Sequence, residues 1–390
     1  MTPTGQTGNS PLGEIVVQLY GQTDVGRTRE HNEDAFMIAD LSGSDCSIDG
    51  AVRTISAGAR GTLFMVADGL GGAAAGEIAS EMAIATVLEE MQKRWVDSDS
   101  ADPEVFAAAL KSAAETANVR IHSYAVEHPE SRGMGTTATI AGLLLDTLYL
   151  VQVGDSRGYL VRHGVARQIT RDQSLMQRLI DAGELTAEEA ERSERRNIIL
   201  QALGPEPLVK VDLTYQKIRR GDILVLCTDG LSGLVTREEM NQVLATELDL
   251  GDACRVLIDR ANENGGPDNI TVVAARFDGN GLGTSELDDS VGHAVFPLPG
   301  AAPSISTMPT REMHTGPSPK PVFREIEITP ERTPVVVDAV PAGRGTNRML
   351  TVALAAVIAL LAIFLALRAM RGQAAPPGSV PQQGPSRQAP

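Results

Sequence analysis

Five aspartates stand beside short apolar stretches, mostly next to glycine, where side chains from several strands could converge on one cleft. They are Asp34, Asp68, Asp155, Asp229 and Asp268. Clustered carboxylates repel one another, so they need a countercharge, and the simplest is a divalent metal ion. An Asp-Gly pair taken alone is more typical of a turn than of a ligand, but five such acids favour a metal site. Ligation by oxygen alone selects Mg²⁺ or Mn²⁺ rather than zinc.

Short β-rich stretches with turn residues between them would position these acids. The tight connections Asp146-Thr147 and His163-Gly164 indicate antiparallel hairpins. The predicted strands cover residues 15–20, 63–67, 137–145, 148–153, 159–162, 223–227 and 270–275.

Amphipathic helices are expected between the strands. Apolar residues recur at spacings of three and four over residues 78–95, and again over a second helix that Asp102-Pro103 opens with a cap and an N1 proline. A capping box at Thr236–Glu239 opens a third helix. Many antiparallel strands with a few helices predict an α+β fold of packed sheets with helices outside them. Residues 40–60 indicate a loop insertion, and residues 176–196 a mobile surface flap.

The C-terminal part of the chain has a different composition. Residues 349–367 are 19 apolar residues without a charge, and as a helix they would span about 28 Å, close to the thickness of a bilayer core. Arginines flank both ends, so the positive-inside rule does not orient this predicted transmembrane helix. The absence of a signal peptide and the unpaired cysteines predict a single-pass protein of the cell (inner) membrane with a cytoplasmic catalytic domain. The predicted organisation is a disordered N-terminus (1–13), a catalytic domain (14–280), a Pro-rich linker (281–348), the transmembrane helix (349–367) and a short disordered tail (368–390).

The charge and the cysteines exclude several function classes. The chain carries a formal net charge of −16, which repels phosphate backbones and argues against nucleic acid as a partner. Ordinary solubilising surface charge accounts for most of this excess. Cys46, Cys227 and Cys254 form no C-x-x-C pair and no C-x5-R loop, which argues against a zinc site, a disulfide framework and a thiol nucleophile.

Seven motifs follow one another along the chain. They are Arg29–Asp34, Asp68-Gly69-Leu70-Gly71-Gly72, Gly133-Met134-Gly135-Thr136-Thr137, Gly154-Asp155-Ser156-Arg157, Asn197 with Ala202-Leu203-Gly204, Thr228-Asp229-Gly230-Leu231 and Asp268-Asn269-Ile270-Thr271. In this order they resemble the PPM (type 2C) metal-dependent protein phosphatases of bacteria. The resemblance covers about residues 15–278 and implies two packed antiparallel β-sheets flanked by helices, acting as a monomeric catalytic domain.

The resemblance implies a site for two Mn²⁺ or Mg²⁺ ions. Asp68 would bridge the two ions, and the carbonyl of Gly69 would bind one of them. Asp229 and Asp268 would hold the other ion.

Further site residues follow from the same resemblance. Glu33 and Asp34 would bind waters on the ions, and Asp155 together with Asp229 would hold a third, weaker metal. Arg29 would clamp the phosphate, because its planar fork suits two oxygens.

The implied reaction is hydrolysis of phosphoserine and phosphothreonine in proteins, including serine/threonine kinases of the membrane. Hydroxide held between the ions would attack phosphorus, while Arg29 and the metals offset charge on the equatorial oxygens. One departure concerns the leaving oxygen. Some family members carry a histidine where this chain has Leu70, so a metal-bound water is the candidate proton donor.

The sequence leaves three other functions to compare with this one. A binding-only relative is expected to have lost a metal acid, and Asp34, Asp68, Asp229 and Asp268 are all present. A different two-metal hydrolase could act on nucleic acid or on small phosphoesters, and the low basic content speaks only against a nuclease. A structural membrane adaptor would explain the apolar stretch and the linker, but not the acids.

Overall fold

The computed structural model describes residues 13–43, 52–71, 75–246, 249–286 and 289–298, which all belong to one compact unit, Met1–Ser306. The N-terminal tail up to residue 12, most of the predicted linker, the apolar stretch 349–367 and the C-terminal tail lie outside the described residues. Within the described ranges, no helix combines the length and the apolar character that crossing a bilayer requires. The membrane anchor therefore stays a prediction.

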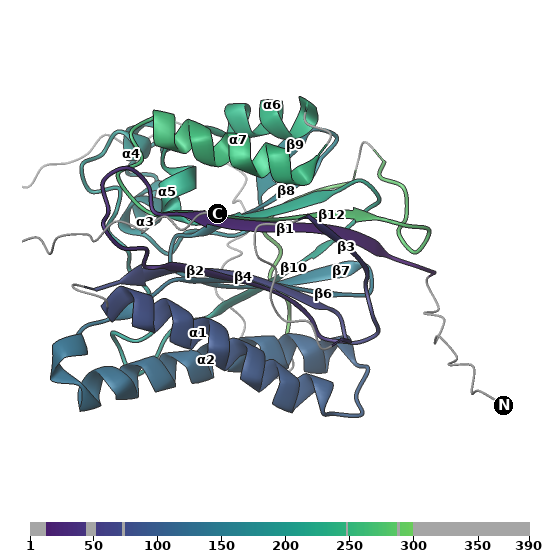
Figure 1. Ribbon diagram of the computed structural model, residues 1–390, viewed down its shortest axis with the longest axis horizontal. Helices are drawn as coiled ribbons and strands as arrows, with labels where there is room; N and C mark the ends of the chain where they lie inside the picture. Colours follow the sequence, from purple (N-terminus) through teal and green to yellow (C-terminus); the bar gives the residue numbers. More distant parts are fainter. Residues whose placement is uncertain (1–12, 44–51, 72–74, 247–248, 287–288, 299–390) are drawn as a thin grey trace, which may run out of the picture. The chain divides into compact units, whose positions relative to one another are not determined.

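Two six-stranded antiparallel sheets form the centre of the described residues (Figure 1). This confirms the predicted pair of packed antiparallel sheets. Sheet A has the order β3 (Arg53–Ser56), β1 (Val16–Asp24), β12 (Ile270–Asp278), β11 (Ile223–Cys227), β8 (Arg157–Arg162) and β9 (Val165–Gln168). Sheet B has the order β10 (Asp212–Lys217), β7 (Thr147–Val153), β6 (Ala138–Leu144), β4 (Thr62–Leu70) and β2 (Asp34–Asp40), and β5 (Gly135–Thr136) pairs with β4.

The two predicted hairpins are present. His163 and Gly164 join β8 to β9 with φ angles of 53° and 75°, the left-handed conformation that a two-residue hairpin turn needs. Between β6 and β7 the turn residues are Leu145 and Asp146 rather than Asp146 and Thr147, and Leu145 takes a φ of 53°. The turn between β6 and β7 thus lies one residue earlier than predicted.

Helices cover the outer face of each sheet (Figure 1). α1 (Ala75–Met91), the π-helical turn η1 (Gln92–Val96) and α2 (Pro103–Glu127) lie on sheet B, while α6 (Arg237–Thr246) and α7 (Leu250–Glu263) lie on sheet A. Short helices complete the connections: η2 (Pro129–Ser131), α3 (Leu175–Asp181), α4 (Ala187–Glu191) and α5 (Asp229–Ser232). α3 and α4 lie in the predicted flap segment.

Helix caps fix where the long helices begin. The side chain of Asp102 accepts a hydrogen bond from the N–H of Glu104 over 2.9 Å, with proline at the first helical position of α2. At α6, Thr236 and Glu239 exchange the two hydrogen bonds of a capping box. Both caps confirm the predicted helix starts.

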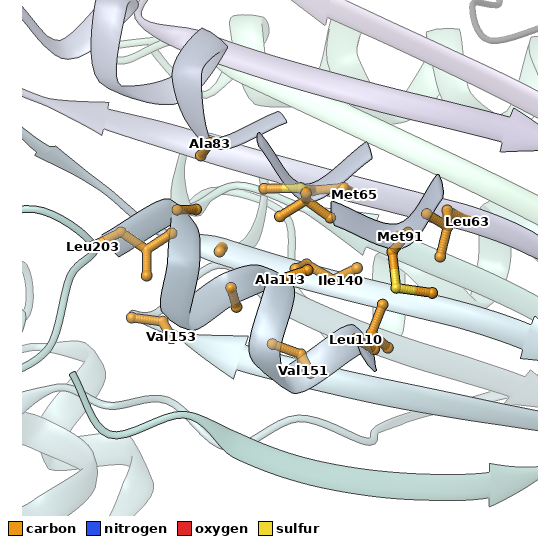
Figure 2. Packing of buried hydrophobic residues seen from close by; sticks show 14 of the residues in the cluster. Leu63, Met65, Ala83, Met91, Leu110, Ala113, Ile140, Val151, Val153 and Leu203 are labelled. Atoms are coloured by element: carbon orange, nitrogen blue, oxygen red, sulfur yellow. The ribbon is translucent and has the colours of Figure 1, made fainter. Parts of the chain in front are cut away.

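The apolar core forms three layers. Figure 2 shows the layer between sheet B and its helices, where Met65 and Ile140 of the sheet meet Leu110 of α2 and Met91 of α1. A second layer lies between sheet A and helices α6 and α7. The third lies between the sheets, where the rings of Phe64 and Phe277 meet edge to face with centroids 6.5 Å apart. These layers hold both sheets in place, and the acids lie where the strands leave the core.

Part of the predicted insertion at 40–60 is a strand. β3 pairs with β1, with Val17 opposite Ile55. The strand β3 has only four residues, Arg, Thr, Ile and Ser, and most of them are polar. No strand pattern is visible in this segment, so its pairing depends on the available edge of β1.

Residues 281–286 and 289–298, predicted to be the start of the linker, pack against the domain. Tyr215 N–H donates to the carbonyl of Ala294, and Phe296 N–H donates to the carbonyl of Leu213 over 3.0 Å, so the segment covers the edge strand β10. The ring of Phe296 meets those of Tyr149 and Tyr215 with centroids 5.2 Å and 5.6 Å away. The packed region therefore ends at or beyond residue 298 rather than at residue 280.

Candidate metal centre

Asp34 and Asp68 lie opposite each other in sheet B. Asp34 is the first residue of β2, Asp68 lies near the end of β4, and the antiparallel register pairs the two residues directly. The N–H of Gly69 donates to the carbonyl of Glu33 over 3.1 Å. Behind this pair, the N–H of Asp68 donates to Thr137 Oγ1 over 2.9 Å. The sheet thereby fixes two carboxylates at one of its ends.

Sheet A and the connection between the sheets supply the other three aspartates. Asp229 lies two residues after the end of β11 and opens α5, and Asp268 lies two residues before the neighbouring antiparallel strand β12. Asp155 lies in the connection from β7 of sheet B to β8 of sheet A. The charge of Asp229 contributes to the raised pKa of Asp68, so carboxylates from the two sheets lie close to each other. The structure therefore brings together all five aspartates that the sequence singled out.

Burial and mutual repulsion raise the pKa of four of these aspartates. Burial is the main cause for each. It raises the pKa of Asp34 and of Asp155 from 3.8 to about 7, with the charge of Asp229 adding to both. The pKa of Asp68 lies well above its ordinary value, because burial and the carboxylates of Asp34 and Asp229 act together. The pKa of Asp229 is also raised, by burial and by Asp268. The centre thus gathers buried carboxylates that repel one another when they are ionised.

A divalent cation fits this set of residues. Asp155 Oδ1 is buried and has no hydrogen-bond partner among the described residues, as expected for an oxygen placed to bind an ion. At Gly69 a Cβ atom would lie 2.3 Å from the carbonyl oxygen of Gly76 and 2.5 Å from that of Glu33, so the chain can approach the acids closely only with glycine there. The oxygen-only donors suit Mg²⁺ and Mn²⁺.

The side chains do not form a closed cage. In the described part of the chain, no three His, Cys, Asp or Glu side chains are already arranged around one point as the ligands of an ion. An ion bound here would therefore also take ligands from water and backbone carbonyls, which hard cations accept.

Arg29 and Glu33 lie on a loop at the rim of the centre. Arg29 Nη2 donates to Asp268 Oδ2 over 2.9 Å, and Arg29 Nη1 lies 4.0 Å from Glu33 Oε2. The arginine side chain is 46% exposed, so its guanidinium can reach an incoming anion. Burial is the main cause that raises the pKa of Glu33, which Arg29 opposes. The loop thus places one cation and one acid beside the five aspartates.

Sequence reasoning missed the side chains that hold this loop and the acids. Asn269 accepts a hydrogen bond from the N–H of Glu33 over 2.8 Å and donates to the carbonyl of His31 over 2.9 Å. Thr228 and Thr271 donate to the carboxylate of Asp34. All three residues belong to the motifs around Asp229 and Asp268 that carry the family resemblance, and this was the signal in the sequence that could have pointed to their role.

Comparison with known proteins places this geometry in a family. A family model described as Protein phosphatase 2C matches residues 42–262. The serine/threonine phosphatase stp of Listeria monocytogenes is 35% identical over 257 residues, which cover 66% of this chain and 94% of that protein. The serine/threonine protein phosphatase PstP of Mycobacterium tuberculosis is 37% identical over 262 residues, which cover 67% of this chain and 45% of that protein.

Solved structures agree with this match. The serine/threonine phosphatase of S. agalactiae superposes with a TM-score of 0.58 at 32% identity, covering 67% of this chain and 99% of that one. The catalytic domain of PstP in complex with two manganese ions superposes with a TM-score of 0.54 at 34% identity, covering 68% of this chain and 99% of that one. The chain belongs to the protein phosphatase 2C (PPM) family and is a serine/threonine protein phosphatase.

Proposed function

We propose that this phosphatase works with two Mn²⁺ or Mg²⁺ ions held by Asp68, Gly69, Asp229 and Asp268, and that Asp155 with Asp229 holds a third, weaker ion. The observation that carries the proposal is the concentration of buried carboxylates whose pKa values are raised by burial and by one another. The manganese complex of the similar PstP domain supports it. When bound, the ions would activate a water as the nucleophile and offset charge on the phosphate.

The residues of the chain have separate tasks in this reaction. Asp34 and Glu33 are assigned the orientation of water at the metal centre, because Asp34 lies directly opposite Asp68 in sheet B and Glu33 precedes it beside Arg29 at the rim. Arg29 exchanges its contact with Asp268 for the phosphate and offers two N–H groups to two oxygens. Leu70 has no proton to give, so the serine or threonine oxygen leaves with a proton taken from water.

Phosphate release from a phosphothreonine peptide tests this site. The full chain is assayed with Mn²⁺, with Mg²⁺ and with EDTA, beside Asp229→Asn and the exposed control Asp259→Asn. We expect metal-dependent turnover in the wild type and in the control, and a loss of two orders of magnitude or more in Asp229→Asn, roughly what removing a group that stabilises charge in the transition state costs. Turnover that persists in EDTA, or an active Asp229→Asn variant, would refute the assignment.

We also propose that residues 349–367 anchor the enzyme in the cell membrane, with the catalytic domain in the cytoplasm. Support comes from the length and the uncharged apolar character of this stretch. An anchored enzyme meets membrane-bound phosphoproteins at a high effective concentration, so its substrates would include receptor-type serine/threonine kinases. Deletion of 349–367 should move the protein from the membrane fraction to the soluble fraction and raise phosphorylation of membrane proteins. A protein that fractionates unchanged would contradict the anchor.

A further inference from the structure

Two buried threonine hydroxyls bond the same oxygen of Asp34. Thr228 Oγ1 donates to Asp34 Oδ2 over 2.8 Å, and Thr271 Oγ1 donates to the same atom over 2.7 Å. Both threonines are fully buried, and Asp34 is 8% exposed. Asp34 begins β2 of sheet B, while Thr228 follows β11 and Thr271 lies in β12, both of sheet A. The two hydrogen bonds therefore cross from one sheet to the other at the metal centre.

Further hydrogen bonds fix the direction in which the hydroxyl protons point. The N–H of Thr271 donates to Thr228 Oγ1 over 3.0 Å, so that hydroxyl accepts there and gives its own proton to Asp34. Thr271 Oγ1 also lies 2.7 Å from Thr23 Oγ1, which in turn accepts from Asn32 Nδ2 over 2.9 Å. Because the single proton of the Thr271 hydroxyl is donated to Asp34, Thr23 must be the donor to Thr271. Asn32, Thr23 and Thr271 therefore form a series of hydrogen bonds in which each donor points toward Asp34.

The donors to Asp34 are uncharged. An arginine or lysine in their place would orient the carboxylate but would also neutralise it, and so compete with a metal ion for its charge. A hydroxyl orients the carboxylate and leaves the negative charge available. Both hydroxyls donate to Oδ2, which leaves Oδ1 for a water or an ion at the metal centre.

We propose that Thr228 and Thr271 are positioning residues of this phosphatase, whose hydroxyls hold Asp34 Oδ2 so that Asp34 Oδ1 presents its charge to the water of the metal centre. The inference rests on the proposed role of Asp34 at that centre. Thr228 adjoins Asp229, and Thr271 lies three residues after Asp268. The same segments that carry the acids of sheet A therefore also set the orientation of the acid from sheet B.

Near-isosteric substitutions test the proposal in the full-length enzyme. Thr228→Val and Thr271→Val remove the hydroxyls and keep the volume, while Thr→Ser at the same positions keeps the hydroxyls. We expect each valine variant to lower kcat by about tenfold to a hundredfold, the usual size of a lost hydrogen bond to a charged group, with the KM of a phosphopeptide changed by less than about threefold. Mn²⁺ affinity, measured by calorimetry, should weaken several-fold, and the serine variants should recover both quantities.

A matched control separates positioning from general destabilisation. Thr147 is also buried and its hydroxyl also donates to an aspartate, Asp146, over 2.9 Å, but it lies at the opposite end of β7 from Asp155. Thr147→Val should lower the melting temperature as the other valine variants do, and leave kcat and Mn²⁺ affinity unchanged. Equal losses of kcat in all three valine variants would overturn the proposal.

A double-mutant cycle with Asp34→Asn gives the decisive outcome. If the threonines act through Asp34, adding Thr271→Val to Asp34→Asn costs little further kcat, whereas independent effects multiply. Full multiplication, or valine variants with wild-type kcat and Mn²⁺ affinity, would refute the inference. If Thr271→Val does not fold, Thr23→Val removes the donor behind Thr271, and a smaller loss of kcat is expected there. A wild type that binds Mn²⁺ without turnover would refute the proposed function, while the affinities of the variants would still test the positioning.

Discussion

Replacing Asp155 by asparagine should stabilise the metal-free protein in a pH-dependent manner. Asp155 is 7% exposed, and its Oδ1 atom has no hydrogen-bond partner among the described residues. Burial, with Asp229 and Asp172 adding to it, raises the pKa of Asp155 from 3.8 to about 7, against the opposing charge of Arg157. Asparagine has nearly the same shape and no charge, so Asp155→Asn removes this cost without emptying the site.

The sign and size of the effect follow from linkage. The pKa of Asp155 is higher in the folded state than in the unfolded state, so between pH 4 and pH 7 the folded protein binds more protons. Its contribution to stability is therefore fully present below pH 4, is lost as the pH rises, and stays lost above pH 7. From pH 5 to pH 8 the wild type should lose roughly 3 kcal/mol that the variant keeps, which corresponds to about 6 °C in the melting temperature of a domain of this size.

Thermal unfolding at pH 5 and pH 8, in EDTA and in Mn²⁺, measures this difference. The exposed residue Asp259 provides the control Asp259→Asn. In EDTA, the advantage of Asp155→Asn over the wild type should grow from pH 5 to pH 8. In Mn²⁺ at pH 8 the order should reverse, because an ion bound by Asp155 stabilises the folded wild type by mass action. An Asp155→Asn variant whose melting temperature differs from the wild type by the same amount at both pH values would refute the reasoning.

Three further substitutions test other parts of the structure. Gly69→Ala would place a Cβ 2.3 Å from the carbonyl oxygen of Gly76, so calorimetry should show Mn²⁺ affinity weakened at least about tenfold; unchanged affinity would contradict the close packing. Asp222→Ala would leave the buried guanidinium of Arg162 without the carboxylate it bonds at 2.9 Å, and urea unfolding should show a loss of about 3–5 kcal/mol; a loss below 1 kcal/mol would speak against a buried pair. Phe296→Ala would empty the contact with two tyrosine rings and cost about 1–2 kcal/mol, and limited proteolysis should then cut faster between residues 281 and 298; an unchanged cleavage pattern would contradict docking of this segment.

Much of the fold could be predicted from the sequence because local and long-range signals agree. The helix that begins at Asp102-Pro103 has both a cap and an apolar period. The strand around Val225 is apolar throughout, because helices cover one face of sheet A and sheet B covers the other face. The convergence of the acids could be expected from antiparallel pairing, because the start of one strand then lies beside the end of its neighbour. Asp34 at the start of β2 and Asp68 near the end of β4 are paired in this way.

The rest depends on contacts that carry no local pattern. The segment between residues 281 and 298 contains one proline and no apolar period. Its docking follows from Leu282, Val291, Phe296 and Leu298, which pack against the domain, and from the edge of β10. Thr228 and Thr271 look like ordinary strand residues, since threonine is common in strands. Their role at Asp34 becomes visible only when the register of three strands is known.

The division of the acids between the sheets gives a bound ion a structural effect as well as a chemical one. Asp34 and Asp68 belong to sheet B, Asp229 and Asp268 lie just outside the strands β11 and β12 of sheet A, and Asp155 lies in the connection between the sheets. Repulsion among these carboxylates therefore acts between the two sheets, beyond the end of the apolar layer that holds the sheets together. A cation that binds acids of both sheets replaces this repulsion by attraction. Metal binding should thus hold the two sheets more tightly together at the end that carries the proposed metal centre. The same event would fix the positions of the acids and supply the positive charge that the phosphate needs.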